Sequence, residues 1–314
     1  MTNNKISRFK LLIMFAAVLM LFACSSVKHG LYEMGLNHEY KKAGLCLKTI
    51  DMDGKSISLV ESERDPAKPT IILIHGLTAN KENWVRFSRY LTDAYHVVAI
   101  DLPGHGASVK DLNMRYDLDD QVIYIHDILG RLNISQCHMA GNSMGGAIAC
   151  LYATAYPEQV QSLFLIDPAG IYDYKSELTQ LIDEGKNPFI VKCDDDFEKL
   201  LNLAMEDKSN LPPWPFVSVM AEKAIENQVI NKKLCLDFGG EHKYVFKEEL
   251  QKINAPTLIL WGRKDRILSI DTAWVFEQLI PHSKKVVFEG IGHLPMLEAP
   301  EKSAQVYLDF ISSL

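Results

Sequence analysis

The chain has 314 residues, of which 47% are hydrophobic and 23% are charged, and its formal net charge is −7. This length is long for one compact domain and short for two, and the composition is that of a globular protein with a large core. The negative net charge argues against a nucleic-acid partner, for which a basic surface is expected.

The first 24 residues differ from the rest of the chain. Lys5, Arg8 and Lys10 precede an unbroken apolar run over residues 11–23, which ends at Cys24. The run is short for a membrane span, and a basic start before a short apolar core is typical of a signal peptide. The Leu-Phe-Ala-Cys ending resembles a bacterial lipobox, which implies a signal peptide over residues 1–23 and lipidation of Cys24.

The lipobox resemblance also implies a location in the bacterial cell envelope. Several acyl chains on one cysteine anchor a protein stably, and Ser25 after the cysteine favours the outer membrane. An uncleaved anchor and simple secretion are the alternatives. Residues 24–43 are then expected to be a polar spacer with weak helical character between the anchor and the folded domain.

Residues 44–170 alternate between strand and helix patterns. Residues 45–50 and 56–61 form a predicted hairpin with Asp-Gly in its turn. Continuous apolar runs, typical of strands buried on both faces of a parallel sheet, occupy residues 70–74, 96–100, 134–140 and 161–166. Helical patterns lie between them at residues 82–92, 119–132 and 147–156. This alternation predicts an α/β fold with a mostly parallel, doubly wound sheet.

The alternation stops over residues 171–244. This stretch has helical patches, three prolines around Trp214 and no convincing strand, so we expect an inserted helical cap. The α/β pattern resumes in a second core part, residues 245–314, with predicted strands and helices at residues 257–261, 272–279, 285–288 and 299–314. Long interruptions of a regular fold usually lie over a ligand site.

Residues 141–145, Gly-Asn-Ser-Met-Gly, match the G-x-S-x-G pattern of a nucleophile elbow. The pattern lies between a predicted strand and a predicted helix, as an elbow requires. A serine at the tip of so tight a turn has strained backbone geometry, and a Cβ on the flanking glycines would collide with the turn. The alternative is a glycine-rich loop in which Ser143 caps the helix.

An activated serine needs a base, and the base needs an acid. Asp265 follows the predicted strand 257–261, and His293 follows the strand 285–288. Because ligands bind outside the carboxyl ends of the strands in such sheets, Ser143, Asp265 and His293 should converge at one edge. Their order along the chain is the order of an α/β-hydrolase triad.

Other residues at strand ends compete for these roles. Asp167 also ends a strand, but we expect it to be a loop or capping residue, and we expect Asp101 to be structural. His75 is expected to order its loop by hydrogen bonding, and His105 to support the Pro-Gly-His-Gly turn.

The tetrahedral intermediate needs preorganised hydrogen-bond donors. The backbone N–H of Met144, after the nucleophile, is expected to be one of them. The second should be the N–H of Leu77, in the loop that follows His75-Gly76. This chemistry calls for no metal and no cofactor.

Cysteine spacing gives no framework for the fold. Without Cys24, an odd number of cysteines remains, and none shows the spacing of a metal site. Cys137 and Cys150 fall at apolar positions and should be inert core residues. Cys193 and Cys235 could pair in an exported protein, but disulfides do not organise this chain.

Taken together, several motifs over residues 45–314 resemble the α/β-hydrolase superfamily. They are the segments at residues 75–77, 101–106, 141–146, 261–265 and 292–293. More narrowly, residues 80–84 and 167–171 are similar to bacterial family V lipases of the Moraxella and Psychrobacter type and to membrane-bound monoacylglycerol lipases. Haloalkane dehalogenases and epoxide hydrolases are disfavoured because they carry aspartate where this chain has Ser143.

The resemblance implies a serine ester hydrolase that cleaves acylglycerols or related lipid carboxylic esters through an acyl-enzyme. The alternatives are a C–C bond hydrolase or a general carboxylesterase of the same fold, and a lipoprotein that only binds a ligand. We expect a monomer whose partners are a small lipid ester and a membrane, and no nucleic acid.

Overall fold

The structure is a computed structural model that describes residues 25–238 and 247–314. The predicted signal peptide, the predicted lipidation site Cys24 and the end of the predicted cap therefore lie outside the described residues. The strands are β1 (Leu45–Met52), β2 (Lys55–Ser62), β3 (Thr70–Ile74), β4 (His96–Ile100), β5 (Cys137–Asn142), β6 (Val160–Ile166), β7 (Thr257–Gly262) and β8 (Ser283–Phe288).

The helices alternate with the strands in the first and last parts of the chain. They are α2 (Ser25–Lys42), α3 (Val85–Ser88), α4 (Leu118–Arg131), α5 (Met144–Ala155), α6 (Glu177–Asp183), α7 (Asp194–Ala204), α8 (Phe216–Glu226), α9 (Gln228–Phe238), α10 (Lys247–Leu250), α11 (Asp271–Leu279), α12 (Pro295–Glu298) and α13 (Pro300–Ile311). Short 3₁₀ turns are η1 (Lys81–Trp84) and η2 (Pro157–Gln159).

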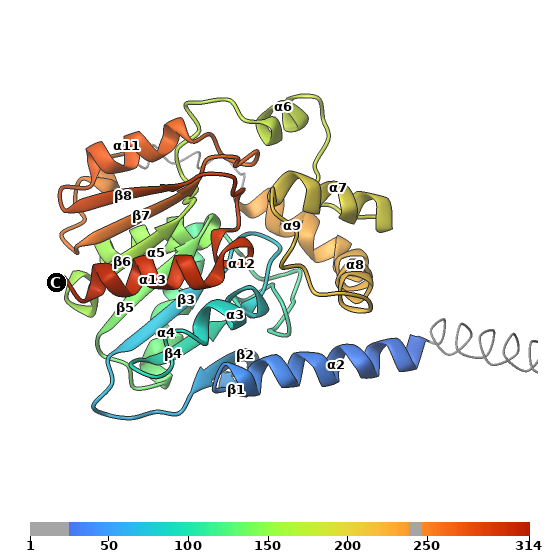
Figure 1. The fold of residues 1–314 in the computed structure, drawn as a ribbon, viewed down its shortest axis with the longest axis horizontal. Helices are drawn as coiled ribbons and strands as arrows, with labels where there is room; N and C mark the ends of the chain where they lie inside the picture. Colours follow the sequence, from blue (N-terminus) through green and yellow to red (C-terminus); the bar gives the residue numbers. More distant parts are fainter. Residues whose placement is uncertain (1–24, 239–246) are drawn as a thin grey trace, which may run out of the picture.

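In the described part of the chain, the strands form one eight-stranded sheet in the order β1-β2-β4-β3-β5-β6-β7-β8. The hairpin β1–β2 and the pair β2–β4 are antiparallel, and every other neighbouring pair is parallel. This arrangement confirms the predicted α/β fold with a mostly parallel sheet (Figure 1).

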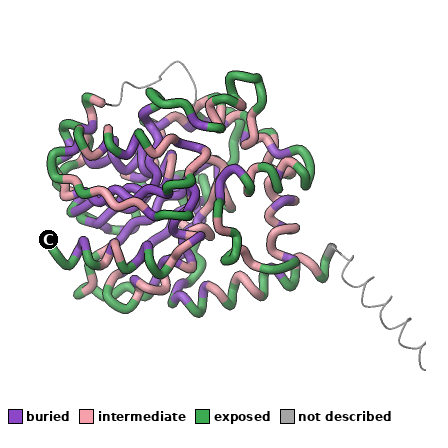
Figure 2. The backbone as a smooth tube through the Cα atoms, turned by 45° about the horizontal axis from the view of Figure 1, so that its top comes forward, coloured by how far each residue is buried: buried purple, intermediate pink, exposed green. Residues whose placement is uncertain are grey.

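Helices cover both faces of the sheet. On one face, side chains of α4, α5 and α11 form one hydrophobic cluster with the strands, and on the other face α3, α12 and α13 form a second cluster (Figure 1). Every residue of β4, β5 and β7 is buried, as the purple strands in Figure 2 show. Strands that are apolar throughout bury both faces, so the sheet is a fixed platform for the loops at its carboxyl edge.

Residues 171–238, which we call the helical segment, lie over that carboxyl edge (Figure 1). The described chain forms α6, α7, α8 and α9 there and no strand. The segment has a small core of its own, around Val191, Phe197 and Ala221. Leu203, Ala204 and Met205 at the end of α7 join the main core instead, so this is where the segment is fixed to the sheet.

Residues 25–42, in the expected spacer, form one continuous helix that packs on the folded chain. Tyr32 and Tyr40 are buried and Leu36 is partly buried, so the four-residue spacing puts an apolar line along one side of α2. Lys28 and His29 hydrogen bond to Glu222 of α8 in the helical segment. Within the described residues, no helix is long and apolar enough to cross a membrane.

The five described cysteines are free. Cys137 and Cys150 are buried, and burial raises the pKa of both thiols, that of Cys137 to about 12. They are inert core residues, as expected. Cys193 and Cys235 are not bonded to each other in this structure.

Candidate active site

Ser143 forms the turn between β5 and α5. Its φ is 55° and its ψ is −119°, a backbone conformation that a residue with a side chain rarely adopts. The neighbouring strand β6 fixes the turn, because the Ser143 N–H donates to Ile166 O and the Ala169 N–H donates to Ser143 O, both at 3.0 Å. The Ser143 side chain makes no capping hydrogen bond to α5, so its hydroxyl is not used to hold the helix.

The glycines on either side of Ser143 allow backbone to pack against backbone. A Cβ on Gly141 would lie 2.2 Å from Gly145 O, and a Cβ on Gly145 would lie 2.2 Å from Ile74 O. A side chain at Gly141 would therefore push the start of α5 away from β5, and one at Gly145 would push it away from the end of β3. The elbow geometry that the G-x-S-x-G pattern predicts is present in the structure.

The loop after β3 passes directly beside Ser143. A Cβ on Gly76 would lie only 3.2 Å from the Cβ of Ser143. In the described chain, the N–H groups of Leu77, next in this loop, and of Met144, the first residue of α5, donate no hydrogen bond to another residue. The N–H of Met144 has no partner within the helix because the first N–H groups of a helix lack one, and the loop N–H of Leu77 is also unpaired within the described chain, so both donors are available to a ligand.

His293 and Asp265 are in direct contact. His293 Nδ1 lies 2.7 Å from Asp265 Oδ2, and their side chains are 4% and 0% exposed. The other carboxylate oxygen, Oδ1, accepts the N–H groups of Ile267 at 2.7 Å and Leu268 at 3.0 Å. Asp265 is thus held by backbone donors, and a bond from Nδ1–H to it leaves His293 Nε2 free to accept a proton.

Ser143 and His293 line the same pocket. Asn142, the residue before the serine, donates through Nδ2 to His293 O and to Ile166 O, both at 3.1 Å. No hydrogen bond joins the Ser143 hydroxyl to the His293 ring among the described residues; such bonds are often long without a substrate. The structure therefore brings the predicted side chains to one sheet edge, and Asn142 links the two loops.

Glu298 of α12 is a buried carboxylate that sequence reasoning missed. It is 2% exposed and accepts N–H groups on both sides of His293, from Gly292 at 3.0 Å and from Leu294 at 3.3 Å. It also accepts the N–H groups of Glu206 at 3.0 Å and Asp207 at 2.8 Å, just after α7. Burial raises the pKa of Glu298, although these donors oppose the shift. One carboxylate therefore ties the histidine loop to the helical segment.

His75 and His105 have the supporting positions expected of them. Fully buried His75 bonds through Nδ1 to Gly76 O at 2.8 Å, and its Nε2 accepts the Leu102 N–H at 3.1 Å. Burial lowers the pKa of His75 to about 4, so the ring is neutral at neutral pH. His105 bonds to Pro103 O at 3.1 Å, and its ring centre lies 4.9 Å from that of His75.

The two competing aspartates are both fully buried. Asp101 accepts the Lys81 Nζ at 2.7 Å and the Ala107 N–H at 2.8 Å, so it is structural, as expected. Asp167 lies beside Asp265: one side-chain atom each of Asp167, Asp265 and His293 lies within 4.8 Å of the others, a spacing that could also hold a metal ion. His293 hydrogen bonds to Asp265, however, and this contact fits a proton-transfer triad.

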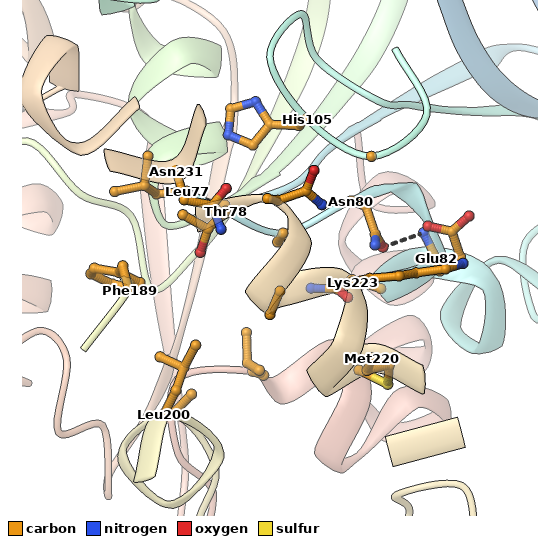
Figure 3. A pocket seen from close by; sticks show the side chains of 18 of the residues that line it. Leu77, Thr78, Asn80, Glu82, His105, Phe189, Leu200, Met220, Lys223 and Asn231 are labelled. Atoms are coloured by element: carbon orange, nitrogen blue, oxygen red, sulfur yellow. Dashed lines mark hydrogen bonds between the residues drawn. The ribbon is translucent and has the colours of Figure 1, made fainter. Parts of the chain in front are cut away.

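The pocket has a volume of about 430 Å³ and contrasting walls. The helical segment supplies an apolar wall, which consists of Phe189, Phe197, Leu200, Leu201, Met205 and Met220. The opposite side carries polar groups of the loop after β3, and Figure 3 shows Leu200 across the pocket from His105 and Asn80. Tyr32 of α2 also lines the pocket, and Lys223 Nζ lies 4.1 Å from the centre of its ring.

Comparison with known proteins agrees with this geometry. The sequence profile of the alpha/beta hydrolase fold family matches residues 69–189 and 194–300. Lipase 1 of Psychrobacter immobilis is 30% identical over 283 residues, which cover 89% of this chain and 88% of that protein. The human monoacylglycerol lipase ABHD6 is 30% identical over 258 residues, which cover 79% of this chain and 76% of that protein.

A solved structure is similar over the whole chain. The crystal structure of a membrane phospholipase A, described as a bacterial virulence factor, has a TM-score of 0.87 and 37% sequence identity. The match covers 100% of this chain and 99% of that chain. The resemblance to family V lipases and monoacylglycerol lipases predicted from the motifs is thereby confirmed.

Proposed function

This chain belongs to the α/β-hydrolase fold family, and on that premise we propose that it is a serine ester hydrolase that cleaves lipid esters. The observation that carries the proposal is the 2.7 Å contact between His293 Nδ1 and Asp265 Oδ2, in the pocket where Ser143 stands at positive φ. An acid–base pair beside a serine that caps nothing is the arrangement that activates a hydroxyl.

In the proposed mechanism, Ser143 Oγ attacks the ester carbonyl while His293 Nε2 takes its proton. Asp265 holds the imidazole in one tautomer and stabilises the imidazolium that forms. The N–H groups of Leu77 and Met144 stabilise the negative oxygen of the tetrahedral intermediate. His293 then protonates the leaving alcohol, and water releases the acid from the acyl-enzyme.

The pocket supports a lipid ester as the substrate. Its apolar wall from the helical segment suits an acyl chain, and the polar side near Asn80 suits an alcohol or head group. The similar proteins are a lipase, a monoacylglycerol lipase and a phospholipase A, and enzymes with these names act on acyl esters of lipids. We extend this substrate class to the present chain as part of the proposal.

The nucleophile is tested by Ser143→Ala, with exposed Ser56→Ala as the matched control. Removal of the hydroxyl should abolish hydrolysis of p-nitrophenyl butyrate and labelling by a fluorophosphonate, whereas the control should keep both. Circular dichroism checks that the fold is retained. Substantial turnover by Ser143→Ala would show that another group does the chemistry.

The substrate class is tested by rates on mono-, di- and triacylglycerols, a phospholipid and p-nitrophenyl esters of increasing chain length. Higher kcat/KM for lipid esters than for the shortest p-nitrophenyl ester supports the proposal. A preference for short water-soluble esters would favour a general carboxylesterase, and cleavage of a vinylogous 1,5-diketone would favour a C–C bond hydrolase.

We also propose that the protein is held in the bacterial cell envelope by a lipid on Cys24. The support is the lipobox-like sequence and the similarity to a membrane phospholipase A. Expression of Cys24→Ser should move the protein from the membrane fraction to the soluble fraction of the envelope. Unchanged retention in the membrane would mean that lipidation is not what holds it.

A further inference from the structure

Asp167 is a buried acid that the proposed mechanism does not use. It follows β6 directly, is 0% exposed and has a φ of 43°. Its Oδ1 accepts the Gly262 N–H at 2.9 Å, but its Oδ2 has no hydrogen-bond donor among the described residues. A buried carboxylate with one oxygen unpaired is unfavourable, so the ionised form of Asp167 is poorly stabilised here.

The carboxyl group of Asp265 lies close to that of Asp167. One oxygen of each aspartate lies within 4.8 Å of the other and of a ring nitrogen of His293. Two buried carboxylates this close repel each other, so one of them holds a proton. A protonated carboxyl is a donor, and the pair then forms a hydrogen bond in place of a repulsion.

The number of donors around each carboxyl decides where the proton lies. Asp265 accepts the N–H groups of Ile267 and Leu268 and the His293 Nδ1–H, whereas within residues 25–238 and 247–314 the Asp167 side chain accepts only the Gly262 N–H. Donors stabilise the charged form of a carboxyl group, so the negative charge belongs to Asp265 and the proton to Asp167.

The electrostatic surroundings of Asp167 act in the same direction. Burial is the largest cause that raises the pKa of Asp167 well above the ordinary range, and the charge of Asp265 raises it further. The charge of buried Glu298 adds to the rise, whereas the hydrogen bond from the Gly262 N–H opposes it.

We propose that Asp167 is a positioning residue of the triad: a neutral carboxylic acid that donates a hydrogen bond to Asp265. The proposal rests on the proposed function, because it assigns Asp265 as the triad acid. The pair then carries a single negative charge, and the fourth donor to Asp265 fixes the carboxylate against His293. Asp167 is thus neither a second catalytic acid nor a capping residue.

Replacement of Asp167 by asparagine, which has nearly the same shape, distinguishes a neutral Asp167 from an ionised one. In Asp167→Asn, the amide Oδ1 can still accept the Gly262 N–H and Nδ2 can donate to Asp265, as a neutral acid would. We expect this variant to lower kcat by only a few-fold, whereas Asp167→Ala, which has no donor, should lower kcat by about tenfold or more, with a smaller change in KM. Exposed Asp93→Asn is the matched control.

Comparison with Asp265→Asn completes the activity test, because that variant should lose about 10⁴-fold in kcat. Equal losses for Asp167→Asn and Asp265→Asn would overturn the proposal, since Asp167 would then carry the charge. Wild-type kcat in Asp167→Ala would also overturn it. Asp167→Leu fills the space without a donor, so a loss in this variant like that of Asp167→Ala, together with rescue by asparagine, supports the proposal, whereas wild-type kcat in Asp167→Leu would show a merely space-filling role.

The protonation state can also be read without any substrate. In wild-type protein labelled with ¹³C at the aspartate carboxyls, the resonance that disappears in Asp167→Asn should have the chemical shift of a protonated acid at neutral pH. The shift of an ionised carboxylate would overturn the proposal. This measurement does not depend on hydrolysis, so its failure is distinct from failure of the Ser143→Ala test.

Discussion

The carboxyl edge of the sheet and the helical segment face each other across one pocket but are built differently. At the sheet edge, the Asp265 and His293 side chains are at most 4% exposed, and backbone groups bind Asp265, His293 and the turn at Ser143. The helical segment contributes apolar side chains and exposes Tyr172, Ile182 and Trp214 by 45% or more. The difference suggests that the proposed chemistry depends on backbone geometry, whereas selectivity depends on side-chain shape.

The strongest test of the sheet edge removes the charge of Asp265, the proposed triad acid. Asp265→Asn should lower kcat for p-nitrophenyl butyrate by about 10⁴-fold, because an amide favours the wrong tautomer of His293. KM should change much less. A loss in kcat below tenfold would mean that Asp265 at the sheet edge does not take part in the chemistry as proposed.

The contact between the two regions is tested at Glu298. Glu298→Ala leaves the N–H groups of Gly292, Leu294, Glu206 and Asp207 without their acceptor, so we expect it to lower the free energy of unfolding by about 3 kcal/mol or more. Urea denaturation measures this loss, and Glu298→Gln, which keeps an acceptor oxygen, should lose less. Equal stability of Glu298→Ala and wild type would show that the two regions are held together elsewhere.

The burial of side chains at the sheet edge should also make the free energy of unfolding depend on pH. His75 is neutral in the fold, and burial lowers its pKa from 6.5 to about 4. Between pH 6.5 and pH 4 the unfolded chain binds a proton at His75 and the folded chain does not. The free energy of unfolding is therefore unaffected by His75 above pH 6.5 and falls as the pH falls toward 4, by about 3 kcal/mol at most.

His75→Gln should therefore flatten the decline of the unfolding free energy between pH 6.5 and pH 4. Urea denaturation at several pH values measures the slope. Part of the slope should remain, because burial also lowers the pKa of His105. An unchanged slope in His75→Gln would mean that other groups cause the whole effect.

The opposite wall of the pocket should respond with a change in selectivity. Leu200→Trp narrows the apolar side, so the ratio of kcat/KM for long against short acyl esters should fall by about tenfold. Leu236→Trp on α9, where the leucine is 64% exposed, is the matched control. If Leu200→Trp lowers kcat equally for all chain lengths, the apolar wall is part of the chemical centre. The assignment of chemistry to the sheet edge and of selectivity to the helical segment would then be wrong.

The smallest effect is expected where α2 meets the helical segment. Glu222→Gln removes the charge that faces Lys28 and His29, and the Glu222 side chain is 35% exposed. Partly exposed ion pairs contribute little, so the free energy of unfolding should fall by less than about 1 kcal/mol. A loss above about 2 kcal/mol, measured by urea denaturation, would show that α2 is a structural part of the helical segment.

Much of the sheet could be predicted because its strands are apolar throughout. The predicted bounds of β3 and β4 agree with the structure to the residue. The helix expected over residues 82–92 instead ends at Ser88, because the N–H groups of Tyr90 and Leu91 turn back to carbonyls three residues earlier. Periodicity predicts that a helix exists, but such end contacts decide its length.

The candidate site was predictable where a rule about strand ends applies, as it does to Asp265 and His293. Asn142 and Glu298 were not, because their partners are backbone groups distant in sequence, such as His293 O and the Glu206 N–H. The helical character of α2 was expected, but its packing on the folded chain was missed, because Tyr32 and Tyr40 are apolar contacts within an otherwise polar stretch. In each case the deciding partner is tertiary and leaves no local pattern.

The close approach of backbones at Gly141 and Gly145 has a consequence for how this chain can change over generations. Every side chain larger than hydrogen at Gly141 or Gly145 meets a carbonyl oxygen at 2.2 Å, so random substitution there should yield few folded clones. Libraries that vary the helical segment should yield many. We therefore expect new substrate preferences to arise from substitutions in the helical segment, while the turn at Ser143 stays almost unchanged.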